Sequence, residues 1–274
     1  MLVVLLMPNS FEGAIGIFDS GVGGLTVAKA IMECMPNESI IYLGDTARVP
    51  YGTKSPETVI RYAQTCSKIL IERGVKMLVI ACNTASAHAI PILQEEYSIP
   101  VLGVVNPGAQ AAVDATQTKS IGVIATEGTI SSEIYSKAIR SLDTSAHVHT
   151  KACPMFVPLA EEGWLEGEVP RKIAQAYLEE YTIHNIDTLV LGCTHYPLLT
   201  NTIQEVVGKN VRLVDSAKET ARVVHETLNA MDALADSNEL GIHEFLVSDD
   251  PDKFNRIGEA FLGQRVEPVE WVDV

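Results

Sequence analysis

The stretch MLVIACNTAS, residues 77–86, decides the fold, because an apolar run ends here in a cysteine followed by small polar residues. The run is continuous rather than alternating, which is typical of a strand buried on both faces of a parallel sheet. The stretch TLVLGCTHYP, residues 188–197, has the same design 111 residues later, again with a cysteine at the end of the run. Both stretches continue into a helical pattern. The chain is therefore predicted to contain two matching strand–cysteine–helix units.

Two further pairs of apolar runs repeat at nearly the same offset. The run IGIF (15–18) returns as IGVIA (121–125) after 106 residues, and PVLG (100–103) returns as VRLV (211–214) after 111 residues. Three strands in the same order at a nearly constant spacing predict two copies of one α/β unit. The run SIIYL (39–43) is expected to add a strand to the first copy.

One helix between these strands has clear signals at both ends. Ser55 is typical of an N-cap and Pro56 of the first helical position, and the helix is expected to stop at Arg73 and Gly74. Apolar side chains recur between these ends at the spacing of one helix face, namely Val59, Ala63, Cys66 and Leu70.

These patterns predict an α/β fold of two similar doubly wound domains with parallel-sheet cores, related by a pseudo-twofold axis. Ligands of open parallel sheets bind beyond the carboxyl ends of the strands. The active site is therefore expected in the cleft between the two domains, where the strand ends of both copies face each other.

Composition narrows the class of protein. The chain has 274 residues, 47% of them hydrophobic, and 19 glycines, which fits a packed α/β protein rather than a disordered or fibrous one. Its 20 basic and 35 acidic residues give a net charge of −15, so nucleic acid and anionic membranes are not expected as partners. The acidic excess from Asp215 onward is interpreted as a solvated face.

The apolar run LVVLLM (2–7) has no basic residue before it and is too short for a secretory signal or a membrane span. The five cysteines show no regular spacing of the kind found in disulfide frameworks. Reduced thiols and a cytoplasmic location are therefore predicted.

Cys82 and Cys193 are the candidate reactive residues, because each follows a strand and precedes a helix. A thiol at a helix N-terminus meets the positive end of the helix dipole and unpaired N–H groups, which favour the thiolate. Two thiols at matching positions of a repeat are difficult to explain by packing. The other three cysteines are interpreted as small buried residues, namely Cys34, Cys66 and Cys153.

Asn83, Thr84 and Thr194 place neutral hydrogen-bonding groups beside these thiols. Together with the N–H groups of a helix N-terminus, they could hold carboxylates without a lysine or an arginine. Each could also be a helix N-cap, and the two roles are compatible.

Three alternative functions are open at this point. The segment FDSGVGG (18–24), with Asp45 ending the next strand, favours a dinucleotide site, but Thr26 stands where the third glycine is needed. Cys82, Cys193 and His195 could ligate zinc, although the chain has no CxxC or HExxH pattern. A two-domain cleft would also suit a non-catalytic module that binds amino acids.

Four segments in the same order, FDSGVGG (18–24), GDTARVPYG (44–52), ACNTAS (81–86) and GCTHYP (192–197), resemble those of the glutamate racemase family. Aspartate and hydantoin racemases share the paired cysteines but not the whole set. The extension 1–14 lies outside the resemblance. The resemblance implies an isomerase that interconverts L- and D-glutamate without cofactor or metal and supplies D-glutamate for peptidoglycan, and thus for cell-wall biogenesis and cell shape.

The resemblance also implies two domains, of which the first is formed by two separate chain segments and the second by one. The first comprises residues 1–105 together with 215–274, and the second comprises residues 106–214. The internal repeat supports the two copies, but it does not place the C-terminal tail. Glutamate is the implied small-molecule partner, and assembly as a homodimer is left open.

Residue by residue, the resemblance implies that Cys82 takes the α-proton of D-glutamate and Cys193 that of L-glutamate. Asp19 would assist Cys82, while His195 and a third helper, Glu161, would complete the catalytic set. The substrate would be bound by Asp19, Ser20, Tyr51, Gly52, Asn83, Thr84, Thr194 and His195. Two sulfurs that each reach one carbon at about 3 to 3.5 Å should lie roughly 6 to 7.5 Å apart, without a disulfide.

Overall fold

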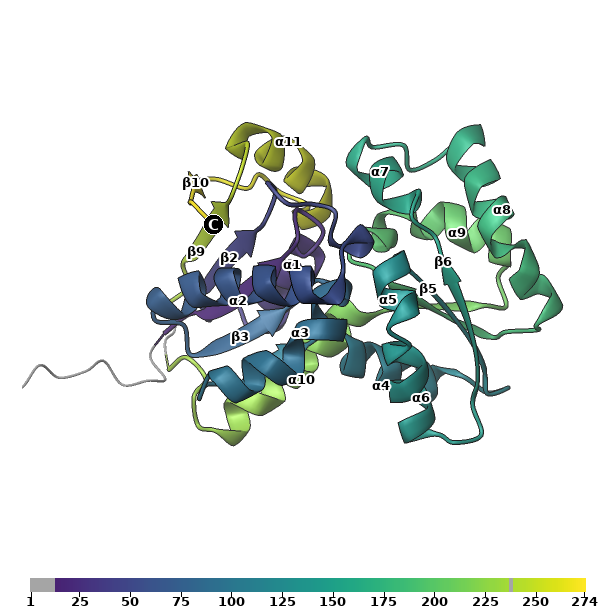
Figure 1. Ribbon diagram of the computed structural model, residues 1–274, viewed down its shortest axis with the longest axis horizontal. Helices are drawn as coiled ribbons and strands as arrows, with labels where there is room; N and C mark the ends of the chain where they lie inside the picture. Colours follow the sequence, from purple (N-terminus) through teal and green to yellow (C-terminus); the bar gives the residue numbers. More distant parts are fainter. Residues whose placement is uncertain (1–12, 237–238) are drawn as a thin grey trace, which may run out of the picture.

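The apolar runs of the sequence pair with one another in parallel and form two separate sheets (Figure 1). The computed structural model describes residues 13–236 and 239–274. The apolar run at residues 2–7 and most of the extension 1–14 lie outside these described residues. In the described part of the chain, no helix combines the length and the apolar character needed to cross a membrane.

The first sheet has six strands in the order β10-β9-β2-β1-β3-β4, and all its neighbours are parallel. Its strands are β1 (Ile15–Asp19), β2 (Ile40–Gly44), β3 (Met77–Ile80), β4 (Val101–Gly103), β9 (His243–Val247) and β10 (Val269–Trp271). Helices cover both faces, as predicted. One face carries α1 (Leu25–Cys34), α10 (Ser216–Ala230) and α11 (Pro251–Leu262), and the other carries α2 (Pro56–Glu72) and α3 (Asn83–Glu96).

The second sheet has four parallel strands in the order β6-β5-β7-β8. They are β5 (Ser120–Ala125), β6 (His147–Ala152), β7 (Thr188–Gly192) and β8 (Arg212–Asp215). On one face pack α4 (Val105–Ala115) and α6 (Ile134–Leu142), and on the other α7 (Phe156–Glu161), α8 (Glu168–Ile183) and α9 (Thr200–Val207). The short α5 (Glu127–Ser131) follows β5.

The strand orders confirm the internal repeat. The order β2-β1-β3-β4 in the first sheet matches β6-β5-β7-β8 in the second, so each predicted pair of runs occupies equivalent places. The prediction for α2 is also confirmed, because Ser55 caps the helix, Pro56 stands in its first turn and it ends at Arg73. The four residues of its predicted apolar face are all buried.

The sequence reading missed β6, β9 and β10. β6 is the edge strand of its sheet and carries the polar run HVHTKA, none of it fully buried, so it has no continuous apolar pattern. β9 pairs with β2 and is far from it along the chain. Because such pairing depends on contacts distant in sequence, local patterns do not reveal it.

The C-terminal tail packs on the first sheet. α10 packs against α1, β9 extends the sheet beyond β2, and the figure shows α11, β9 and β10 beside the N-terminal strands (Figure 1). This placement supports the division into residues 1–105 with 215–274 and residues 106–214, which stays a prediction. The chain passes between the two halves through α4 and again between β8 and α10.

Candidate active site

A small cavity lies where the two halves meet, beyond the carboxyl ends of β1, β3, β5 and β7. Its volume is about 30 Å³. It is lined by Ser20, Val49, Pro50, Tyr51, Gly52, Cys82, Asn83, Thr84, Thr126, Val157, Gly192, Cys193, Thr194 and His195. A larger hollow of about 510 Å³ between α3, α4, α6 and α10 contains none of the predicted site residues. Nine of the predicted site residues, from both copies, therefore line one cavity at the place that the repeat indicates, whereas Asp19 and Glu161 are not among its lining residues.

Cys82 is the N-cap of α3, and its thiol is almost completely buried. Burial and the nearby charge of Asp19 raise the pKa of this thiol to about 12. Hydrogen bonds from the Ala85 N–H and the Ser20 hydroxyl act in the opposite direction but are weaker. The backbone N–H at the start of α3 favours the thiolate, as expected, but burial has the larger effect on the pKa of Cys82.

Cys193 follows β7, as Cys82 follows β3, and leads into a short 3₁₀ turn (Tyr196–Leu199) rather than directly into an α-helix. Its sulfur lies 3.9 Å from Nδ1 of His195. All five cysteines are free thiols, so Cys82 and Cys193 form no disulfide. Among the three cysteines interpreted as packing residues, Cys66 and Cys153 are buried, whereas Cys34 is exposed.

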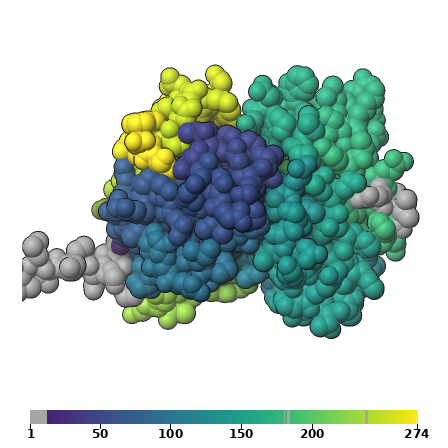
Figure 2. All heavy atoms as spheres, in the orientation of Figure 1, coloured from purple at the N-terminus to yellow at the C-terminus, as the bar shows by residue number. Residues whose placement is uncertain are grey.

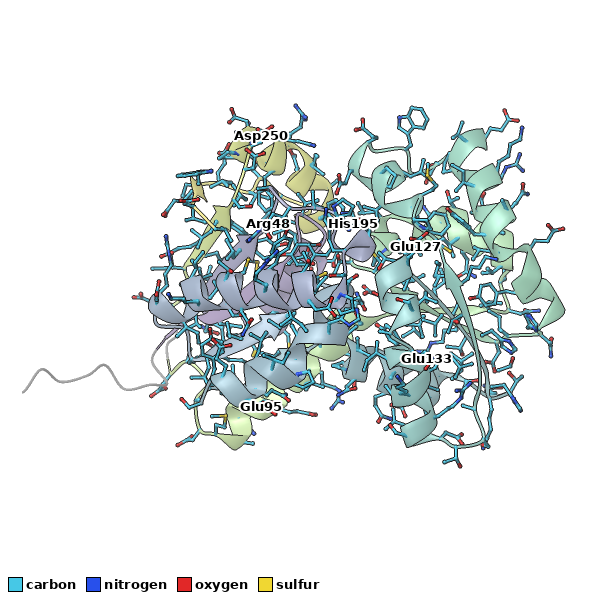
Figure 3. The ribbon with its side chains drawn as sticks, in the orientation of Figure 1. Arg48, Glu95, Glu127, Glu133, His195 and Asp250 are labelled. Atoms are coloured by element: carbon cyan, nitrogen blue, oxygen red, sulfur yellow. The ribbon has the colours of Figure 1, made fainter. Side chains whose placement is uncertain are left out.

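His195 joins Cys193 to Glu161. Its Nε2 lies 3.0 Å from Oε1 of Glu161, at the end of α7. Burial alone lowers the pKa of His195, but the hydrogen bonds and charges of Cys193 and Glu161 outweigh it and raise the pKa to about 10. At neutral pH the imidazole is therefore protonated and can donate to both neighbours. Figure 3 shows His195 near the boundary between the two halves.

Asp19, the last residue of β1, is fully buried. Burial raises its pKa, while the charge of His195 and hydrogen bonds from nearby groups act against this rise. The Gly21 N–H donates to its Oδ2 at 3.0 Å, and the Thr194 hydroxyl faces its Oδ1 at 3.5 Å. Asp19 thus connects the Cys82 side of the cavity with the segment that carries Cys193.

The polar lining of the cavity is neutral apart from His195. None of the described residues that line it is a lysine or an arginine. Arg48, the one arginine or lysine of the four segments, donates to Asp45 at 2.6 Å and lies over the ring of Tyr62. Ligand carboxylates would therefore meet hydroxyl, amide and backbone N–H donors in this cavity.

The loop that carries Tyr51 and Gly52 is held by a buried carboxylate. Asp45 accepts hydrogen bonds from Tyr51 at 2.5 Å and from Ser248 at 2.8 Å, so the tail segment after β9 supports this loop. Gly52 lies against the second half, since a Cβ atom there would stand 2.5 Å from Cβ of Thr126. Only glycine fits at this close approach.

A second close approach involves Thr194 and His195, which also line the cavity. A Cβ atom on Gly23 would stand 2.3 Å from Oγ1 of Thr194 and 2.5 Å from Nδ1 of His195. The FDSGVGG segment therefore packs directly on the segment that follows Cys193. In the space-filling view the two halves are in contact along the boundary between them (Figure 2).

Several cavity residues were missed by the sequence reading, namely Val49, Pro50, Thr126, Val157 and Gly192. Thr126 had a usable signal, because it directly follows the strand IGVIA (121–125). Its hydroxyl lies 2.9 Å from that of Thr84, and both lie 3.1 Å from the hydroxyl of Thr129. Thr84 is thus part of a group of three hydroxyls that connects the two halves.

The arrangement suits proton transfer at a carbon placed between two thiols. One thiol has a carboxylate and a hydroxyl beside it, and the other has a protonated imidazole supported by Glu161. Within residues 13–236 and 239–274, no three His, Cys, Asp or Glu side chains are grouped so that they could hold a metal ion. The zinc alternative therefore has no geometric support in the described chain.

Residues 25–224 match the sequence profile of the Asp/Glu/Hydantoin racemase family. The glutamate racemase of Geobacter metallireducens is 54% identical over 261 residues, which are 95% of this chain and 97% of the relative. A glutamate racemase isoform from Bacillus anthracis superimposes with a TM-score of 0.92 at 42% identity, covering 96% of this chain and 98% of the other. The Francisella tularensis glutamate racemase solved with D-glutamate gives a TM-score of 0.90 at 38% identity, with the same coverage.

Proposed function

The chain belongs to the Asp/Glu/hydantoin racemase family and, within it, to the glutamate racemases, and from this premise we propose that it inverts glutamate by proton transfer between Cys82 and Cys193. The observation that carries the proposal is the position of these two thiols, at equivalent strand ends of the repeat, in one cavity. Asp19 and His195 assist as implied by the resemblance, and Glu161 acts through His195.

The reaction balances with the groups of the cavity alone. The thiolate of one cysteine takes the α-proton, so the Cα–H bond breaks, an S–H bond forms and the electron pair stays on the substrate. The thiol of the other cysteine then gives its proton to the opposite face of the carbon. The two sulfurs have exchanged their protonation states, and the reverse reaction uses the same groups in opposite roles.

The electrostatics of the cavity support this division of roles. A pKa of about 12 keeps Cys82 protonated at neutral pH, which makes it the acid when L-glutamate is bound. Cys193 then removes the proton from L-glutamate, and the protonated His195 beside it stabilises negative charge at its sulfur. When Cys82 has lost its proton, the same high pKa makes it a strong base toward D-glutamate.

Neutral donors hold the two substrate carboxylates in this proposal, through the hydroxyls of Ser20, Thr84 and Thr194, the amide of Asn83 and backbone N–H groups. Asp19 balances the ammonium group. A lysine or arginine at the carboxylates would also attract the thiolate and weaken it as a base. Neutral donors avoid this conflict, and they disfavour a substrate that leaves a buried donor unpaired.

The cellular role follows from the product. D-glutamate would supply peptidoglycan synthesis, and with it cell-wall biogenesis and cell shape. A cytoplasmic location suits the free thiols of the chain. Assembly as a homodimer stays open.

Incubation with L-glutamate in heavy water, without added cofactor, tests the proposed function. We expect loss of optical rotation together with uptake of deuterium at the α-carbon. A module that only binds amino acids would bind glutamate without exchange, and this result would refute the proposal. L-aspartate and L-alanine serve as comparison substrates, and faster racemisation of aspartate than of glutamate would contradict the assigned specificity.

A further inference from the structure

We propose that Tyr135 is a positioning residue that fixes the side-chain amide of Asn83 so that its NH₂ group faces the substrate. The proposal rests on the proposed function, because it assigns a partner to one of the groups that would bind glutamate. Tyr135 belongs to α6 in the second half, whereas Asn83 is the first residue of α3 in the first half. The contact between them therefore connects the two halves beside the cavity.

The hydrogen bonding of Asn83 is asymmetric. The Tyr135 hydroxyl donates to Oδ1 of Asn83 at 2.6 Å. In contrast, the buried Nδ2 of Asn83 has no hydrogen-bond partner among the described residues. The Asn83 side chain is only 3% exposed and lines the cavity together with Cys82. A buried amide NH₂ without a partner is costly, so it points to a ligand that supplies the acceptor.

The orientation of this amide decides which ligand group Asn83 can bind. Because Oδ1 faces the Tyr135 hydroxyl, the planar amide presents its two N–H donors on the opposite side. Those donors suit a carboxylate oxygen. If the amide were rotated by half a turn, Oδ1 would face the carboxylate and repel it.

Tyr135 is suited to hold this orientation. Its ring is buried, and its hydroxyl lies close to Gly108, where a Cβ atom would stand 3.1 Å away. Burial and the charge of Asp215 raise the pKa of Tyr135 well above its usual range. The hydroxyl therefore keeps its proton at neutral pH, and it remains a donor.

The test is a double-mutant cycle on Tyr135→Phe and Asn83→Ala, with KM and kcat measured for both enantiomers of glutamate. Tyr135→Phe removes only the hydroxyl. We expect KM to rise about tenfold while kcat changes by less than about threefold, because the lost orientation weakens binding in ground state and transition state alike. In the Asn83→Ala background, where no amide is left to orient, Tyr135→Phe should raise KM no further.

The control is Tyr181→Phe, which also removes a buried tyrosine hydroxyl. That hydroxyl donates to Val123 O at 3.0 Å within the second half, away from the cavity lining. Tyr181→Phe should lower the melting temperature without changing KM. Binding of D-glutamate by titration calorimetry gives the same comparison if Asn83→Ala is inactive.

Two outcomes would overturn the role of Tyr135. One is a Tyr135→Phe protein whose KM and calorimetric Kd stay within about twofold of wild type, since a lost orienting bond should cost more than that. The other is a rise in KM on Tyr135→Phe that is equally large in the wild-type and in the Asn83→Ala background. These outcomes leave the proposed function intact, whereas a wild-type protein that neither racemises nor binds glutamate would refute that function itself.

Discussion

At the scale of single residues, Cys82 and Cys193 have different surroundings, but a two-base reaction requires both of them. Cys82→Ser and Cys193→Ser should each lower racemisation in both directions by at least about 10²-fold, because either direction uses one sulfur as base and the other as acid. Cys34→Ser and Cys153→Ser are the controls and should keep activity with, at most, a loss of stability. Near-normal racemisation by either of the first two variants would contradict the assignment.

In a complex with glutamate, the two sulfurs should lie about 6 to 7.5 Å apart.

Glu161 is expected to make the stability of the protein depend on pH through His195. The pKa of His195 is raised from 6.5 to about 10, so the protonated imidazole stabilises the fold fully below pH 6.5, and this contribution is lost as the pH rises through about 10. The pKa of Glu161 is lowered from 4.5, although burial alone raises it, because the hydrogen bond and charge of His195 outweigh burial. The contribution of the Glu161 carboxylate to stability is therefore present above pH 4.5 and is lost as the pH falls through the lowered pKa.

Glu161→Gln removes this charge and keeps the shape of the side chain. At pH 6 the variant should be less stable by about 1.5 to 3 kcal/mol, the usual contribution of a hydrogen bond to a charged group. The difference should vanish above about pH 10, where His195 is neutral. Urea unfolding at both pH values measures it. The exposed neighbour Glu162 provides the control, and a Glu162→Gln protein with the same pH-dependent loss would argue against the His195–Glu161 pair.

Much of the site could be predicted from sequence because its residues stand at the ends of strands or shortly after them. Cys82, Cys193 and Asp19 are of this kind, and the repeat shows which strand ends belong together. Tyr135 could not be found in this way. It is the second residue of the amphipathic helix α6, where an inward-pointing tyrosine looks like any core residue, and only the packing of α6 brings its hydroxyl to Asn83. Its partner belongs to the other half of the molecule, 52 positions away.

At the scale of elements, a buried ion pair connects the tail to the first sheet. Lys76, just before β3, lies 2.7 Å from Glu38, just before β2, and each side chain is 3% exposed. The pair also binds the chain after α10, since Lys76 donates to Ala233 O and Glu38 accepts from Ala235 N–H, both at 2.7 Å. These bonds help to place the segment that leads to β9.

Lys76→Met should therefore destabilise the protein by about 3 to 5 kcal/mol, because it leaves the Glu38 carboxylate buried without its partner. The double variant Lys76→Met/Glu38→Gln should recover part of that loss. Lys68→Met, which breaks an exposed pair with Glu72, is the control and should cost less than about 0.5 kcal/mol. Urea unfolding measures all three. Equal losses for Lys76→Met and Lys68→Met would mean that the buried pair does not hold the tail.

The elements found from sequence and those missed differ in burial. β1, β3 and β7 are buried along their whole length, so their apolar runs are continuous and easily recognised. β6 and β10 are edge strands with exposed residues, and their sequences resemble loops. Hydrophobic patterning therefore predicts the centres of both sheets, while their edges depend on pairing between distant segments.

At the scale of the whole molecule, the two halves are too close together for glutamate to enter. A buried water needs roughly 10 to 15 Å³ of such space, so a cavity of about 30 Å³ accommodates about two waters, and an amino acid with two carboxylates is much larger. The halves touch at two places next to residues that line this cavity, through Gly23 against Thr194 and through Gly52 against Thr126. Binding and release of substrate therefore require the halves to separate, and the donors of both halves surround the substrate only after closure.

Gly23→Ala tests whether this close approach is part of turnover. The added methyl group would stand 2.3 Å from Oγ1 of Thr194, so the halves could no longer approach to their full extent. A displacement of about 1 Å at a reacting centre can cost about 10²-fold in rate, and we expect kcat/KM to fall by about that factor. Gly21→Ala, whose methyl group would meet only Val49 at 3.6 Å, is the matched control and should keep most of the activity. The melting temperatures of both variants should stay close to that of the wild type, because each half can keep its own packing while the gap between them widens. If Gly23→Ala racemises glutamate as fast as Gly21→Ala, the halves do not need to close this tightly during the reaction.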